Sequence, residues 1–129
     1  IGYSFTNTYS RLSYHSDSSS GGSVYNINAS GGNLPVVFNF MADNPGHNSN
    51  SATATALSNF RVTKDGSTDI NTVEDFVILT GNGVDTTVWG WNNSGSNGTV
   101  ESSELARIAT LSSYDNDTFA ASNVAFGSL

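Results

Sequence analysis

Cysteine is absent from the 129-residue sequence, so no disulfide bond holds the fold and no thiol performs chemistry. Positive charge is also scarce, because four cationic side chains face 11 acidic ones and leave a net charge of −7. Nucleic-acid binding needs a basic patch, which four scattered cations do not make, so no nucleic-acid partner is expected. No apolar run approaches the length that crosses a bilayer, and no membrane span is expected.

Charged residues make up only 12% of the chain, while hydrophobic residues make up 36%. Most of the polarity therefore comes from Gly, Ser, Thr and Asn, which favour turns, strands and extracellular surfaces over helices. A chain of this length forms one domain with one core. Ile1 stands where an initiator Met would, which indicates a processed or incomplete N-terminus. We expect an extracellular or cell-surface protein.

Alternating or continuous apolar residues mark several segments as strands. A single helix is expected at about 103–111, because Leu105, Ile108 and Leu111 fall on one helical face after two serines. The pattern predicts an all-β domain, a β-sandwich or jelly-roll-like fold, over residues 24–129. The predicted strands are 24–28, 34–41, 52–62, 73–80, 86–91 and 118–129.

The first nine residues form an amphipathic ribbon when extended, since Ile1, Tyr3, Phe5 and Tyr9 fall on one side. Residues 10–23 follow as a Ser/Gly-rich tether. Such a strand either joins its own sheet or adds to the sheet of a neighbouring molecule, where main-chain hydrogen bonds and alternate side chains would hold it. The sequence leaves both arrangements open.

This organisation resembles the donor-strand subunits of bacterial surface pili. The resemblance implies a structural subunit of an extracellular filament or fibre, which polymerises head to tail with copies of itself. No enzymatic role is expected. The chain has only two histidines, and the adjacent His15, Ser16 and Asp17 cannot take the geometry of a catalytic triad.

Residues 93–104 resemble the twelve-residue calcium loop of EF-hand and dockerin-type proteins. The resemblance makes calcium a candidate cofactor, although the third position is Gly95, which has no side-chain ligand. The alternative is an Asn/Gly-rich turn that leads into the predicted helix. The candidate ligands are Asn93, Asn97, Thr99, Glu101 and Glu104.

An alternative function is a carbohydrate-binding or adhesin module, with glycans as partners. Trp89 and Trp91 share one face of their predicted strand, and exposed rings at that spacing would stack on sugars. Large aromatic side chains more often fill the core, and we favour that position for at least one of them. Four N-x-S/T sequons offer candidate glycan attachment sites, at a number that chance alone explains: Asn28, Asn92, Asn97 and Asn116.

Overall fold

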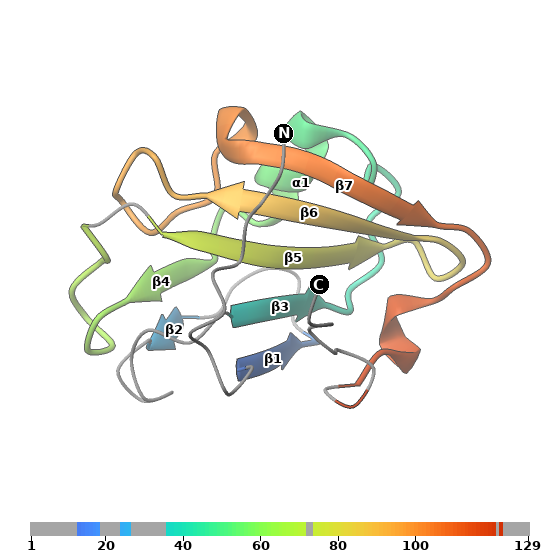
Figure 1. The fold of residues 1–129 in the computed structure, drawn as a ribbon, viewed down its shortest axis with the longest axis horizontal. Helices are drawn as coiled ribbons and strands as arrows, with labels where there is room; N and C mark the ends of the chain where they lie inside the picture. Colours follow the sequence, from blue (N-terminus) through green and yellow to red (C-terminus); the bar gives the residue numbers. More distant parts are fainter. Residues whose placement is uncertain (1–12, 19–23, 27–35, 72–73, 121, 123–129) are drawn as a thin grey trace, which may run out of the picture.

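The computed structural model describes residues 13–18, 24–26, 36–71, 74–120 and 122 (Figure 1). These residues form a mostly β domain with one short α-helix, so the predicted all-β, β-sandwich-like class is confirmed. The elements in chain order are β1 (Ser13–Asp17), β2 (Val24–Asn26), β3 (Val36–Phe40), α1 (Asn50–Ala56), β4 (Arg61–Thr63), β5 (Asp75–Gly81), β6 (Thr86–Asn92), η2 (Ser102–Glu104), β7 (Leu105–Leu111) and η3 (Asn116–Thr118).

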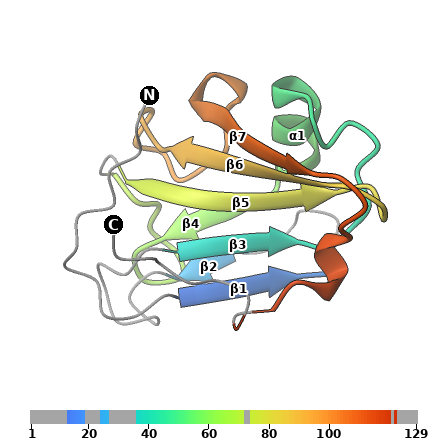
Figure 2. The same cartoon turned by 45° about the vertical axis from the view of Figure 1, so that its right-hand side comes forward.

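Five strands form the main sheet in the order β1-β3-β5-β6-β7, and β2 pairs with β4 in a second, two-stranded sheet. β1, β3 and β5 run parallel, which requires the crossover through α1 and β4 between β3 and β5. β5, β6 and β7 are antiparallel. β1 and β7 are therefore opposite edges of one sheet, as Figures 1 and 2 both show.

The core lies between one face of the main sheet and a layer formed by β2, β4 and the segment after α1 (Figure 2). Phe60 is fully buried at its centre, with ring centroids 4.8 Å from those of both Phe38 and Phe40. Phe76 packs on Trp91 at 4.9 Å. Each fully buried side chain of this size contributes about 1.5–3 kcal/mol, so this aromatic cluster is the main stabilising contact between the layers.

The other face of β3 is joined to η3 by a buried amide pair. Asn39 Nδ2 donates to the main-chain oxygen of Asn116 at 2.8 Å, and Asn116 Nδ2 donates to Asn39 Oδ1 at 2.8 Å and to the oxygen of Phe40 at 2.7 Å. Asn39 Nδ2 also donates to the hydroxyl of Tyr14 on β1 at 2.9 Å. This network fixes the segment that follows β7 against β1 and β3.

The predicted strand 52–62 is wrong over its first half, where the structure has α1. Ser49 is the N-cap and its side chain accepts from the main chain of Ala52. Thr53 and Leu57 are buried four residues apart on one helical face. The alternation of Ala and Thr resembles the pattern of a strand. Alanine favours a helix, however, and the two buried residues are four positions apart, which is the spacing of one helical face.

The predicted helix at 103–111 is also wrong. Only Ser102–Glu104 form a helical turn, and the chain then continues as β7. Leu105 pairs with Trp91 and is buried, whereas Ile108 and Leu111 are 49% and 37% exposed. The three residues therefore do not share one buried face, because pairing with β6 outweighs helical propensity.

The predicted strands at 24–28, 34–41, 73–80 and 86–91 correspond to β2, β3, β5 and β6. Within the predicted tether 10–23, Ser13–Asp17 instead form β1 and pair with β3. The predicted strand 118–129 begins on the last residue of η3, and most of it lies outside the described residues. The predicted polymerisation residues Ile1, Tyr3, Phe5 and Tyr9 lie outside the described residues as well.

Candidate functional site

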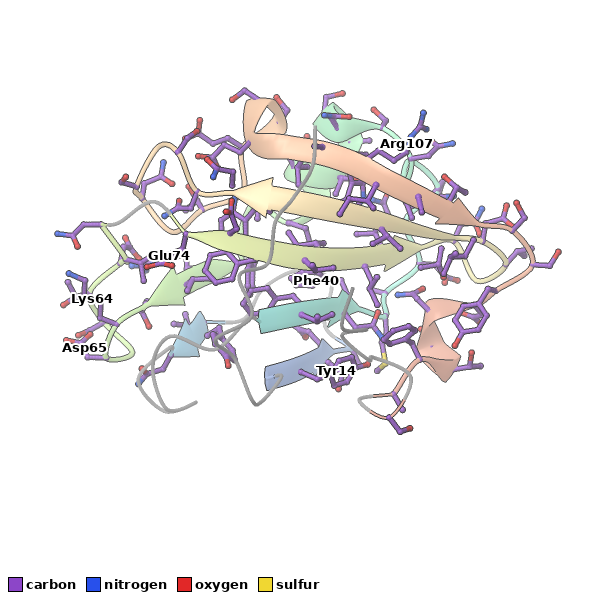
Figure 3. The ribbon with its side chains drawn as sticks, in the orientation of Figure 1. Tyr14, Phe40, Lys64, Asp65, Glu74 and Arg107 are labelled. Carbon is purple, nitrogen blue, oxygen red and sulfur yellow. The ribbon has the colours of Figure 1, made fainter. Side chains whose placement is uncertain are left out.

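β7 is one of the two edge strands of the main sheet, opposite β1. It is seven residues long, and beyond it the described part of the chain supplies no further strand. Arg107 and Thr110 are exposed together with Ile108 and Leu111, and Arg107 lies at the outer margin of the sheet (Figure 3). An edge strand carries a row of main-chain donors and acceptors that another strand can use.

A β-bulge interrupts the pairing of β7 with β6. Ala109 lies opposite Val88 and Arg107 lies opposite Trp89, so Ile108 is the extra residue. A bulge increases the local twist of the strand that contains it. From Ile108 onward side chains alternate again, so Ile108 and Leu111 lie on opposite faces of the sheet.

The beginning of β7 is covered by α1. Asn50, the first residue of the helix, donates from Nδ2 to the main-chain oxygen of Leu105 at 2.7 Å and to that of Ser102 at 3.3 Å. Leu105 is only 5% exposed. The accessible part of the edge is therefore the stretch Ala106–Leu111.

The loop before η2 brings the candidate calcium ligands together, but their oxygens accept hydrogen bonds from the protein. The buried Glu104 carboxylate accepts from Gly95 N at 2.7 Å and from Trp91 Nε1 at 2.9 Å. Asn93 Oδ1 accepts from the main chain of Asn97 at 3.3 Å, and Asn97 donates from Nδ2 to Glu101 at 2.7 Å.

Asn97 Oδ1 also accepts from both the main chain and the hydroxyl of Thr99. Among the described residues, no group of three or more His, Asp or Glu side chains is placed to hold a metal ion. The loop therefore has the hydrogen bonding expected of an Asn/Gly-rich turn, the alternative that the sequence left open.

Both tryptophans are in the core, the position that we favoured for at least one of them, so neither is placed to stack on sugars as the alternative required. Trp89 and Trp91 are each 0% exposed. Trp89 Nε1 donates to Thr80 Oγ1 at 3.0 Å, as Trp91 Nε1 does to Glu104. No face of either ring is open to a ligand. The carbohydrate-binding alternative depended on these rings stacking on sugars, so the fold does not support it.

The four sequons differ in accessibility. Asn116 is 1% exposed and its amide is used inside the fold, so its prediction as a glycan attachment site is wrong. Asn92 and Asn97 are partly exposed, with amides that donate to Asp75 and Glu101. Asn28 lies outside the described residues.

Acidic side chains gather at the end of the sheet that carries the β5–β6 loop. The carboxylate of Asp43 lies so close to Gly83 that any side chain at position 83 would touch it. The φ of Gly83 is 82°, which also favours glycine at this position. Burial raises the pKa of Asp117, and the charges of Asp115 and Asp43 raise it further. This end of the molecule therefore repels anions.

Sequence reasoning missed the Asn39–Asn116 pair and the contact of Asn50 with β7. One signal for the first was present, because Asn39 stands between two phenylalanines in a strand otherwise built from apolar residues. A polar residue at such a position needs a partner inside the fold. Nothing local indicated Asn50, since the helix to which it belongs was predicted as a strand.

No described helix is long and apolar enough to span a membrane. Comparison of the chain with protein-family models, with curated proteins and with solved structures finds no match.

Proposed function

We propose that the chain is a structural subunit of an extracellular filament or surface fibre. In this assembly residues 1–9 of one copy, called the arm below, add as a strand to a neighbouring copy. The observation that carries the proposal is that β1 and β7 are opposite edges of one sheet. The arm is joined to the first edge, and an accessible strand lies at the other.

The sequence of the arm is suited to strand addition. Its alternation of apolar and polar residues matches the two faces of an extended chain, and it contains no charged side chain. Burial of Ile1, Tyr3 and Phe5 contributes roughly 5–9 kcal/mol before the cost of ordering them.

The position of the arm favours an open assembly. Because Ser13 already belongs to β1, only residues 10–12 separate the arm from the sheet. A subunit that donates at one edge and accepts at the other makes a head-to-tail contact, and such contacts extend into a filament unless the rotation closes a ring. The low content of charged side chains and the high content of Ser, Thr, Gly and Asn are consistent with an extracellular location.

The test is assembly of the whole chain against a variant with Ile1, Tyr3 and Phe5 all changed to Ser. The unchanged chain is expected to form filaments visible by negative-stain electron microscopy, with a mass that grows with concentration in light scattering. The Ser variant is expected to remain a folded monomer with a similar thermal melting temperature. A second variant that lacks residues 1–9 should behave in the same way.

Filaments of the Ser variant would contradict the proposal. A large loss of melting temperature in that variant would contradict it too, because it would show that the arm packs within its own domain.

A further inference from the structure

We propose that the acceptor of the arm is the outer edge of β7 in the next copy, over Ala106–Leu111. This inference rests on the proposed function and names the surface that the arm would contact. The edge is part of the described fold, and only its occupant comes from outside the described residues.

The arm cannot pair along the β7 edge of its own chain. A strand added beyond β7 would lie five strand spacings from β1, about 24 Å at about 4.8 Å for each spacing. Residues 10–12 reach at most about 10 Å when fully extended. An arm that pairs along a β7 edge must therefore pair with the β7 edge of another copy.

The chemistry of the edge suits an uncharged amphipathic strand. Ala106–Leu111 contain one charged residue, Arg107, and no proline. Lysine and proline are two of the usual means of blocking an edge, and this stretch has neither of them. The features that limit pairing here are Arg107 and the bulge at Ile108. Since the arm has no charged side chain, Arg107 meets no like charge there.

Two large apolar side chains on the edge remain half exposed. Ile108 is 49% exposed and Leu111 is 37% exposed, and they lie on opposite faces. The apolar side of the arm would cover one of them, as adjacent residues on one face of a sheet do. The Asn50 contact with Leu105 sets where the pairing begins, because that main-chain oxygen already accepts a hydrogen bond.

A symmetric pairing of β7 with β7 of a second copy is the competing occupant. Centred on Ile108, it would place Leu111 of one copy opposite Leu105 of the other, where Asn50 already occupies the edge. It would also place the bulges of both strands side by side, where the ladder is interrupted. The arm needs only the stretch after Leu105, so we favour it.

Crosslinking tests the contact directly, since the chain has no cysteine of its own. Copies with Thr6→Cys are mixed with size-tagged copies that carry Thr110→Cys, and a short bis-maleimide is added. A covalent dimer of one tagged and one untagged copy is expected. Thr55→Cys, at another exposed threonine, which lies on α1, is the matched control and should give at least about tenfold less product.

Blocking the edge is the second measurement. Ile108→Lys should abolish filaments and leave the melting temperature unchanged, because the side chain is half exposed. Val84→Lys makes the same charge change at a residue that is 59% exposed in the β5–β6 loop, and it should leave filaments intact.

The outcomes separate the two proposals. If the Ser variant of the arm loses filaments while Ile108→Lys keeps them and Thr6 does not crosslink to Thr110, the acceptor is wrong and the proposed function stands. If the Ser variant keeps its filaments, both fall. Crosslinked dimers of Thr110→Cys copies alone would show β7–β7 pairing and overturn the inference.

Discussion

Glu104 shows how a single buried carboxylate can organise a loop. It is 5% exposed and accepts from Trp91 Nε1, from the main chain of Gly95 and from the main chain of Glu101. Hydrogen bonds to a charged acceptor contribute more than neutral ones, and a buried donor left without a partner is costly. The side chain therefore joins the 93–104 loop to the core.

Glu104→Gln is expected to lower the free energy of unfolding by about 1.5–3 kcal/mol. The new NH2 group would face N–H groups that donate hydrogen bonds to the carboxylate, so those donors would lose their acceptor. Urea unfolding followed by tryptophan fluorescence measures the change. Glu101→Gln is the matched control. That side chain is exposed, and glutamine keeps an oxygen that can accept from Asn97 Nδ2 and from the main chain of Glu104, so its loss should be smaller than that of Glu104→Gln. Equal losses in the two variants would show that burial of Glu104 does not matter.

Asp65 is the residue with the clearest pH signature. Hydrogen bonds from the main chain of Thr68 and of Ser67 lower its pKa from 3.8 to about 2, in the exposed loop after β4 (Figure 3). Because the folded pKa lies below the unfolded one, its stabilisation is complete above pH 3.8. The stabilisation is then lost as the pH falls through about 2.

Asp65→Asn should therefore have a lower melting temperature than the unchanged chain at pH 7. The difference should narrow between about pH 4 and about pH 2, where the native carboxyl becomes protonated. Melting followed by circular dichroism across that range tests this expectation. If the difference in melting temperature stays constant with pH, the destabilisation by Asp65→Asn would come from the shape of the side chain and not from its charge.

At the scale of the elements, α1 and β7 depend on each other. The Asn50 amide joins the helix to the main chain around the start of β7, where it donates to the oxygens of Leu105 and Ser102. Asn50→Ala is expected to cost about 0.5–1.5 kcal/mol and to speed amide exchange in the first residues of β7.

Asn59→Ala, at an exposed position after α1, is the control for that experiment and should leave exchange in β7 unchanged. Faster exchange spread evenly over β5 and β6 would contradict the local role of Asn50. In that case the substitution would act on the stability of the whole domain.

The central strands could be predicted from the sequence, whereas the candidate site could not. β3, β5 and β6 carry alternating or continuous Val, Ile, Phe and Trp residues, and their position in the middle of the sheet agrees with that pattern. β7 carries Leu, Ala, Arg, Ile and Thr at spacings that also suit a helix. This segment is a strand because it pairs with β6. That pairing joins residues distant in the sequence, so a local sequence pattern could not predict it.

β1 was missed for a similar reason. It lies in a Ser-rich stretch with little strand propensity, and it forms because β3 offers a ladder of five paired positions. An edge strand of this sheet therefore forms because a more central strand offers it a pairing partner. These edges are also where we propose that assembly takes place, so the candidate site was harder to predict than the fold class.

At the scale of the whole molecule, net charge should control assembly. Each copy carries −7 at neutral pH, and like-charged copies repel at low ionic strength. We expect a rise from about 20 mM to about 200 mM NaCl to lower the protein concentration at which filaments appear, since the screening length shortens to below about 10 Å. Light scattering against concentration measures that threshold.

The effect of charge has a simple control. KCl at equal ionic strength should shift the threshold as NaCl does, because screening does not depend on the identity of the monovalent cation. A threshold that rises with salt would show that attraction between opposite charges holds the copies together. The arm, which has no charged side chain, would then not be the main contact.

The positions of β1 and β7 also determine how a fibre of this kind would carry tension. A pulling force would enter each copy at β1, cross every ladder of the main sheet and leave at β7. The ladder with the fewest paired positions is β3–β5, with four, against seven between β5 and β6. Under load, the domain would first separate at the parallel ladder between β3 and β5, at a rate set by the barrier to unfolding.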